Sequence, residues 1–280
     1  MNVAIIGTGR VGATLAFCLA NNKKIDKLFL INRSKETVQG LKYDLMGTFP
    51  ERGGSIIIGD YKNANDADII VITCGVSGAP SGTQLFDTNK KIVENILTEI
   101  KPKKSTKIIV ISTPVDEIAK IVYELSGLDK KQIIGFGGQL DVNRLKYLIY
   151  KNNDNFSTKI KVNFVGVHGA QGVPLFDEAL IRNKDQITET SKNYYKKYLA
   201  ESKFSTFSVA SELAKLVNSL MTDKENILTV SYYDEKNGLF VTWPCIINKN
   251  GVKRPVKIEL TETEKIELDE LIKKRKTSFR

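Results

Sequence analysis

Short β-branched runs separated by stretches of helical spacing constrain the fold of residues 1–139 more than any other feature. Helical patterns such as NKKIVENILTEI (89–100) fall between most of these runs. Near-continuous apolar strands that alternate with helices are typical of a parallel sheet covered on both faces. We therefore predict an α/β fold with a doubly wound parallel sheet, whose strands are VAII (3–6), KLFLI (27–31), SIII (55–58), DIIVIT (68–73), KIIVIS (107–112) and QIIGF (132–136).

A change of pattern near residue 139 predicts a second domain. Thr261 and Glu264 have capping-box spacing and open a predicted final helix. The chain is expected to divide into a domain 1–139 and an α+β domain 140–280. The other elements predicted for the second domain are helices over about 139–151, 186–202 and 206–221, and strands over 159–167, 226–233, 238–247 and from the turn at 248–251 to Leu260.

The net charge of +10, from 42 basic and 32 acidic residues, could indicate a nucleic-acid partner. The basic residues are spread in pairs, however, and no known binding module accompanies them. The densest cluster, KKRK (273–276), falls at the predicted end of a helix, where cations are favourable. We interpret the surplus as solvated surface and expect no nucleic-acid partner.

Short sequence patterns bear on three further questions: a membrane partner, the cellular compartment and a metal site. No apolar run approaches the roughly 18 residues needed to span a bilayer, so no membrane partner is expected. Cys18, Cys74 and Cys245 share no CxxC spacing. Idle thiols are typical of a cytoplasmic protein. We predict no metal site.

A glycine-rich turn directly follows the first strand. In VAIIGTGRVG, Gly7, Gly9 and Gly12 have GxGxxG spacing, with Arg10 and Val11 inside the motif. Such glycines make a tight turn, admit a pyrophosphate and allow close packing of helix on strand, and the helix N-terminus favours the negative charge. We predict a dinucleotide-binding (Rossmann) domain, and Cys74 and Gly75, after the fourth strand, are also expected to bind the cofactor.

The end of the second strand bears on which dinucleotide binds. Asn32 stands where an acidic residue usually accepts the ribose 2′-hydroxyl, and Arg33 and Ser34 follow it. An asparagine does not repel a 2′-phosphate, and the adjacent guanidinium could bind one. We therefore predict NADP as the preferred cofactor. The alternative is NAD, with Asn32 bonded to the ribose and Arg33 directed to solvent.

His168, in VGVHG, is the only histidine of the chain. Alone it could be a proton-transfer residue or an ordinary interior imidazole. Asp141 and Arg144 are three residues apart, so they share one face of a predicted helix and can address one pocket. Each also has a plain structural explanation, as a helix cap and as a surface ion pair.

Several motifs together carry a family resemblance. The segments IIGTGRVG, STPVD, IIGFGGQLDVNR and VGVHG occur in the order and at the intervals typical of the lactate/malate dehydrogenase family. The stretch IINKNGVKRPVKIELTETEK (246–265) resembles that family's closing hairpin and helix. The resemblance covers nearly the whole chain.

The resemblance implies a role for each of the three residues. His168 would donate a proton to a 2-oxo acid as hydride arrives from the nicotinamide, and take it back in reverse. Asp141 would fix the imidazole tautomer and stabilise its charged form. Arg144 would hold the substrate carboxylate through a bidentate pair. Family members are commonly dimers or tetramers, so a homo-oligomer is expected.

The loop after the fourth strand departs from the family pattern. The family has two arginines there, but CGVSGAPSGTQLFDTNKK (74–91) has none. Gly78 falls near the position that specifies the substrate, and Gln84 is nearest to the position that polarises the carbonyl. Lys90 could take the place of a missing arginine only if the fold directs its side chain towards the substrate. The predicted substrate-binding set is completed by Thr113, which replaces the usual asparagine, and by Asn89 and Ser205.

Three functions remain open at this point. We favour an active 2-hydroxy-acid dehydrogenase of altered specificity, because the proton donor, its orienting carboxylate and the carboxylate anchor are all present. A malate dehydrogenase with an unusual distal-carboxylate site is the second. The third is a non-catalytic NADP-binding regulatory protein that kept the fold, an alternative favoured by the loop without arginine.

Overall fold

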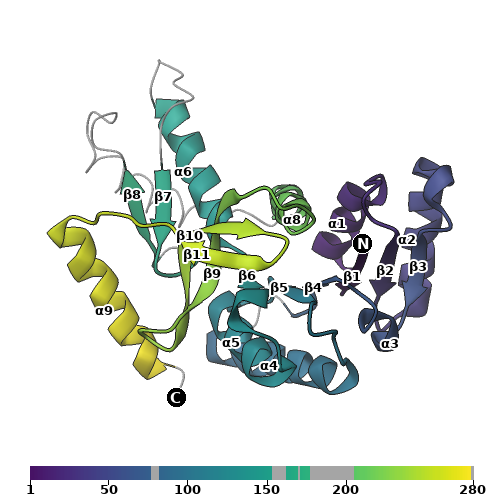
Figure 1. The fold of residues 1–280 in the computed structure, drawn as a ribbon, viewed down its shortest axis with the longest axis horizontal. Helices are drawn as coiled ribbons and strands as arrows, with labels where there is room; N and C mark the ends of the chain where they lie inside the picture. Colours follow the sequence, from purple (N-terminus) through teal and green to yellow (C-terminus); the bar gives the residue numbers. More distant parts are fainter. Residues whose placement is uncertain (77–81, 153–161, 170, 177–204, 279–280) are drawn as a thin grey trace.

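Six parallel strands form the N-terminal part of the sheet in the computed structural model, which describes residues 1–76, 82–152, 162–169, 171–176 and 205–278. Their spatial order is β3-β2-β1-β4-β5-β6, and this confirms the predicted doubly wound sheet (Figure 1). The strands are β1 Asn2–Ile6, β2 Lys27–Ile31, β3 Ile56–Gly59, β4 Ile69–Ile72, β5 Lys107–Val110 and β6 Ile133–Gly135. The helices between them are α1 Arg10–Ala20, α2 Lys35–Thr48, α3 Tyr61–Ala64, α4 Gly82–Glu99 and α5 Val115–Ser126, with short 3₁₀ turns at Pro50–Arg52 and Lys130–Gln132.

Helices cover both faces of this parallel sheet, which explains why its strands are apolar on both sides. One core cluster joins the sheet to α1, α2 and α8 (Phe207–Ser219), through residues such as Leu15, Leu45 and Leu213. The other joins it to α3, α4 and α5, through residues such as Val93 and Ile118. The carboxyl ends of the strands are left open at one edge, where ligands bind in folds of this class.

The C-terminal half adds antiparallel strands to the same sheet. Strand β9 (Asn226–Asp234) pairs with β6 at Ser231 and Gly135, and β10 and β11 follow outward. Because the sheet runs across the predicted boundary, the division after residue 139 stays a prediction. The remaining elements are α6 Gly138–Asn152, the hairpin of β7 Val162–Val165 with β8 Val173–Phe176, β10 Leu239–Asn248, β11 Gly251–Pro255 and α9 Glu262–Ser278.

Two strands differ most from the sequence-based expectation, and each difference involves a proline. Strand β11 ends at Pro255 instead of Leu260: the Val256 N–H still donates to the Pro244 carbonyl (2.8 Å), but Pro244 on β10 has no N–H to return the bond. Strand β8 was not predicted, since Pro174 interrupts its short apolar run. The capping box at the start of α9 is confirmed: the Thr261 N–H donates to Glu264 Oε2, and the Glu264 N–H donates to Thr261 Oγ1. The helix predicted over 186–202 lies outside the described residues.

The interpretation of KKRK as solvated surface is wrong for Arg275. This side chain is 8% exposed, and its Nη1 and Nη2 atoms lie 3.2 Å from Asp116 Oδ2 and 2.7 Å from Glu117 Oε1. The periodicity of α9 turns Arg275 inward while its neighbours Lys273, Lys274 and Lys276 stay exposed.

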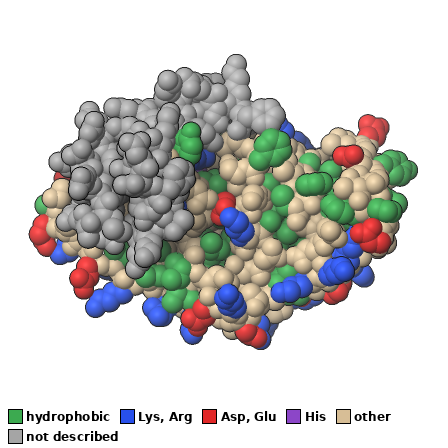
Figure 2. All heavy atoms as spheres, turned by 90° about the horizontal axis from the view of Figure 1, so that it is seen from above, with side chains coloured by type: hydrophobic (Ala, Val, Ile, Leu, Met, Phe, Trp, Pro, Cys, Tyr) green, Lys and Arg blue, Asp and Glu red, His purple; other side chains and the backbone are tan. Residues whose placement is uncertain are grey.

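Elsewhere the charges are mixed: Figure 2 shows basic and acidic side chains interspersed on one face. No helix among the described residues is long and apolar enough to cross a membrane.

Candidate active site

The glycine turn between β1 and α1 leaves room for a ligand. Gly7 has φ +102°, and a Cβ there would lie 2.6 Å from the Cys74 backbone nitrogen. A Cβ on Gly12 would lie 1.9 Å from the Gly7 carbonyl oxygen, so this glycine permits helix and turn to pack. A Cβ on Gly9 meets nothing within 4 Å. The open space therefore lies at Gly9, the N-cap of α1, where free N–H groups favour an anion.

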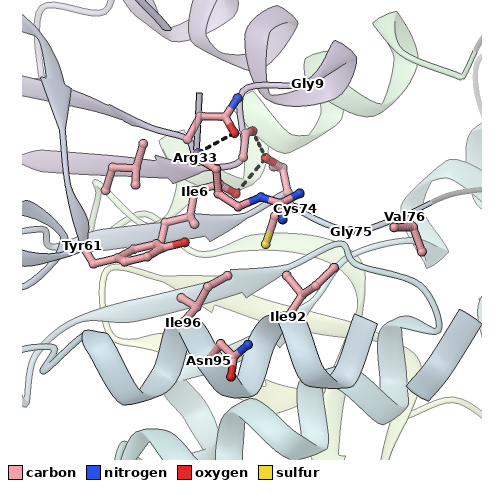
Figure 3. Close-up of a pocket in the computed structure, with 14 residues that line it drawn as sticks. Ile6, Gly9, Arg33, Tyr61, Cys74, Gly75, Val76, Ile92, Asn95 and Ile96 are labelled. Carbon is pink, nitrogen blue, oxygen red and sulfur yellow. Dashed lines mark hydrogen bonds between the residues drawn. The ribbon is translucent and has the colours of Figure 1, made fainter. Parts of the chain in front are cut away.

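A pocket of about 300 Å³ extends from this turn along the carboxyl edge of the sheet. Figure 3 shows α4 forming one side with Ile92, Asn95 and Ile96, while Tyr61 lies at one end and Val76 at the other. Sequence reasoning missed all five residues. Val76 directly follows the predicted Gly75, whereas the other four follow no motif and are brought to the pocket only by the packing of α3 and α4 beside β1 and β4.

The Asn32–Ser34 segment borders the same pocket. The Asn32 side chain donates to Thr8 Oγ1 (3.0 Å) and accepts from the Arg33 N–H (2.8 Å), so its amide is held in place. Arg33 lines the pocket. Burial raises the pKa of Cys74 and of Tyr61, and the positive charge of Arg33 opposes this rise with a smaller effect. Ser34 caps α2 by accepting from the Thr37 N–H.

The side-chain amide of Asn89 connects the loop after β4 to the loop after β5. Asn89, 1% exposed, accepts from the Val76 N–H (2.8 Å), and its Nδ2 donates to the Thr113 carbonyl (2.7 Å). Gly75 packs against the same amide. The contacts of Asn89 thus hold loop backbone in place, and its contact with substrate stays a prediction. Burial raises the pKa of the Cys74 thiol to about 11, so this cysteine is a packed thiol rather than a nucleophile.

The three residues that carried the sequence argument meet in the structure. His168 Nδ1 lies 2.6 Å from Asp141 Oδ2, and Arg144 Nη1 lies 3.2 Å from Asp141 Oδ1. The Gly169 N–H also donates to Asp141 Oδ2 (3.2 Å). Asp141 is 1% exposed, whereas the His168 and Arg144 side chains keep 27% and 14% exposure. A buried carboxylate therefore orients an imidazole and a guanidinium that both reach solvent.

The environment of His168 favours its charged form. Burial is the largest single influence on its pKa and lowers it. The charge and the hydrogen bond of Asp141 act in the opposite direction and together outweigh burial, while the nearby Arg144 lowers the pKa again. The net result is a pKa raised above the ordinary histidine value, so the protonated imidazole persists to higher pH than that of an ordinary histidine.

The imidazole also packs on the backbone at the end of β6. A Cβ built on Gly137 would lie 2.5 Å from His168 Cγ. Gly137 follows β6, and the nucleotide pocket lies at the carboxyl ends of β1 and β4 in the same parallel sheet. The imidazole therefore lies at the edge of the sheet to which the glycine turn belongs.

If His168 has the acid/base role that the family resemblance implies, Gly137→Ala should lower kcat by about tenfold or more, because the methyl group must displace the imidazole and a displaced acid/base loses its alignment. Initial-rate assays across substrate concentration would measure the loss. The matched control is Gly40→Ala, at a helical position where a Cβ meets nothing within 4 Å. A Gly137→Ala enzyme as fast as the control would contradict this prediction.

The other predicted site residues that the structure describes do not line the nucleotide pocket. Arg10 is exposed at the start of α1, Gln84 is exposed in the first turn of α4, and Ser205 is half-buried just before α8. Val11 packs against the core. Gly78 lies outside the described residues. Lys90 pairs with Glu94 (3.8 Å) and lines a cavity between α4, α5 and α9, not the nucleotide pocket.

Comparisons with known proteins agree along nearly the whole chain. Residues 1–135 match the lactate/malate dehydrogenase NAD-binding domain, and residues 200–279 match the α/β C-terminal domain of the same family. The chain is 32% identical to an L-lactate dehydrogenase of Geobacillus sp. (strain WCH70), over 94% of this chain and 90% of that protein. It is 27% identical to L-lactate dehydrogenase 2 of Lactococcus lactis, over 96% and 94%.

Solved structures give the same result. A lactate dehydrogenase from a Medee basin deep-sea metagenome library has a TM-score of 0.87 at 25% identity, covering 98% of this chain and 96% of that one. The malate dehydrogenase of Salinibacter ruber shares the fold with a TM-score of 0.85 at 23% identity, over 98% and 95%. Motifs, site geometry and family matches agree, and the chain belongs to the lactate/malate dehydrogenase family.

Proposed function

We propose that this dehydrogenase interconverts a small 2-oxo acid and the corresponding 2-hydroxy acid, with His168 as the acid/base. The observation that carries the proposal is the 2.6 Å contact between His168 Nδ1 and the buried Asp141, at the sheet edge that also holds the nucleotide pocket. Two relatives named as L-lactate dehydrogenases, each matched over 90% or more of its length, support the substrate class.

The pocket suits a nicotinamide dinucleotide. Gly9 offers open space at the N-terminus of α1 for the pyrophosphate, and none of the lining residues that the structure describes is acidic. When bound, the nicotinamide supplies or accepts the hydride. Ile92 and Ile96 give the pocket an apolar side on which a flat ring can pack.

The protein's own groups handle the proton and the carboxylate. Asp141 accepts from Nδ1–H, which leaves Nε2 as the atom that gives a proton to the substrate oxygen or takes one from it. Arg144, with its fork of donors next to the imidazole, would bind the substrate carboxylate. Reduction of the oxo acid needs the protonated imidazole and oxidation of the hydroxy acid the neutral one, so reduction is favoured at lower pH and oxidation at higher pH. The Asp141 carboxylate moves the change between them to higher pH.

The loop at 74–91 argues for altered substrate specificity. It contains no arginine, so it lacks the usual partner for a second carboxylate. Within the described part of this loop, Lys90 is engaged with Glu94 and lies over the Phe86 ring (6.0 Å). We therefore propose a monocarboxylic 2-oxo acid with an uncharged side chain as the substrate, rather than oxaloacetate.

A panel of 2-oxo acids tests this proposal. Purified protein would be mixed with NADH or NADPH and each acid, and the absorbance of the reduced cofactor followed. We expect turnover of at least one monocarboxylic acid. Fast, selective use of oxaloacetate would favour the malate dehydrogenase alternative, and no turnover of any acid would favour the non-catalytic one.

Within the NAD-binding family, we propose that this chain prefers NADP. Arg33 lines the pocket, and Asn32 stands where an acidic residue would repel a 2′-phosphate. Arg33→Ala should weaken NADPH binding by about 10- to 100-fold, the size of one or two charge-assisted hydrogen bonds, and should change NADH binding little. Fluorescence titration of each cofactor measures this. Lys27→Ala, at the amino end of β2, is the control; equal losses for both cofactors in Arg33→Ala would show that Arg33 does not select a 2′-phosphate.

Family membership and the free cysteines bear on the assembly and the location of the protein. We propose a homo-oligomer, a dimer or tetramer, from family membership, and light scattering of the purified protein would measure its mass. A cytoplasmic location is proposed from three free cysteines, Cys18, Cys74 and Cys245.

A further inference from the structure

A buried polar cluster near His168 takes no part in the chemistry described so far. It contains Asp116 in the first turn of α5, Ser231 on β9 and Thr242 on β10, which are 2%, 1% and 0% exposed. Asp116 Oδ1 and Thr242 Oγ1 have no hydrogen-bond partner among the described residues, while Asp116 Oδ2 lies in ion-pair range of Arg275 (3.2 Å) and the Ser231 hydroxyl interacts with the Asp116 carboxylate. Buried polar atoms are almost always paired with protein groups or ordered water, so the atoms of this cluster that lack a protein partner indicate a site for ordered water.

Backbone contacts join this cluster to the segments that carry His168. Ser231 and Thr242 lie opposite one another in the β9–β10 register. Ser231 also pairs with Gly135, two residues before the Gly137 backbone on which the imidazole packs. Thr242 exchanges two backbone hydrogen bonds with Gly166, two residues before His168 (2.8 and 3.0 Å). The residues that carry the two hydroxyls are therefore paired, through their backbones, with the two segments that position the imidazole.

Asp116 connects the cluster to the C-terminal helix and to a cavity. Arg275 Nη1 lies within ion-pair distance of Asp116 Oδ2 (3.2 Å), and Arg275 also binds Glu117 and the Phe240 carbonyl. Asp116 lines a cavity of about 540 Å³ between α4, α5, α9 and the β9–β10 turn. Asp116 therefore belongs to the wall between this cavity and the cluster, with both of its carboxylate oxygens buried.

We propose that water bound by Asp116, Ser231 and Thr242 links Asp116 to the segments holding His168, and that Asp116 is a second positioning carboxylate that stabilises the imidazolium. This inference rests on the proposed role of His168. Electrostatics support it: the negative charge of Asp116 raises the pKa of His168. Burial raises the pKa of Asp116 itself to about 6, with Arg275 opposing, so the carboxylate is charged above that pH.

The charged groups around these two residues define the controls. His168 faces Asp141 and Arg144 from α6 and Asp116 from α5. Asp116 faces Arg275 from α9 and Glu117 on its own helix. Glu117→Gln removes a carboxylate from the same Arg275 ion pair without touching the cluster, so it is a matched control for Asp116→Asn.

The single histidine makes a direct test possible. In untagged protein labelled with ¹⁵N-histidine, NMR titration follows His168 alone, without substrate or turnover. We expect a lower pKa of His168 in Asp116→Asn than in wild type, and no such decrease in Glu117→Gln, because loss of the Glu117 charge leaves Asp116 ionised. Identical titrations of wild type and Asp116→Asn would overturn the proposal. Because no turnover is needed, this outcome is separate from failure of the proposed enzymatic function.

Kinetics and a crystal structure complete the test. In Asp116→Asn, kcat/KM for oxo-acid reduction should fall about two- to fivefold on the alkaline side of the profile, with the descending arm moved to lower pH. If Asp116→Asn does not fold, Arg275→Gln serves instead, because loss of the guanidinium keeps Asp116 protonated to higher pH and should also lower the pKa of His168. A high-resolution structure should contain water bound to Asp116 and to one hydroxyl; direct contact of the three side chains with no water between them would overturn the water link.

Discussion

Replacement of His168 by asparagine is expected to reduce kcat by about 10²- to 10⁴-fold, the usual contribution of a positioned acid/base. Asparagine is close in size and can still accept or donate a hydrogen bond, but it cannot exchange a proton at neutral pH. Cofactor affinity should stay nearly unchanged, because His168 does not line the nucleotide pocket.

Two measurements together make this test decisive. Initial rates with the best substrate of the 2-oxo acid panel give kcat, and fluorescence titration gives the cofactor dissociation constant. A variant that keeps most of its activity would remove His168 from the mechanism. A variant that loses cofactor binding along with turnover would point to a structural role for the imidazole instead.

Replacement of Asp141 by asparagine should have the second largest effect, a loss of about 10²- to 10⁴-fold in kcat. The carboxylate accepts from Nδ1–H at 2.6 Å and keeps Nε2 free for the substrate. An amide can present its N–H₂ group to the ring instead and select the other tautomer. Asp44→Asn, at an exposed position on α2, is the control.

The same variant should also change the pH dependence. Without the Asp141 charge, burial dominates and the pKa of His168 falls, so the reduction rate should decline at lower pH than in wild type. Because the folded-state pKa of His168 is raised, the pair stabilises the fold fully below the unfolded pKa, and this stabilisation is lost as pH rises through the folded pKa. Urea denaturation should therefore show a larger loss of unfolding free energy in Asp141→Asn at pH 6 than at pH 9. An equal loss at both values would contradict the assigned cause of the shift.

The nucleotide-binding half could be predicted from sequence because its signals are local. Strand VAII and Gly7, Gly9 and Gly12 are contiguous, so periodicity and glycine spacing report the turn directly. The helix face shared by Asp141 and Arg144 is equally local, since residues three apart on a helix are neighbours. Strand β8 was missed because its proline weakens the local pattern.

What the sequence by itself determined is therefore the alternation of strands and helices, the glycine turn, the spacing of Asp141 and Arg144, and the motifs that identify the family. Only the tertiary structure decided that His168 contacts Asp141 across 27 residues of chain, that Tyr61 and Asn95 border the nucleotide pocket, and that Arg275 is buried against Asp116. The physical reason is that hydrophobic periodicity shows which face of an element is buried but not what lies opposite that face. Partners from distant segments are fixed only when sheet register and helix packing bring them within a few ångströms, where burial and charge become specific.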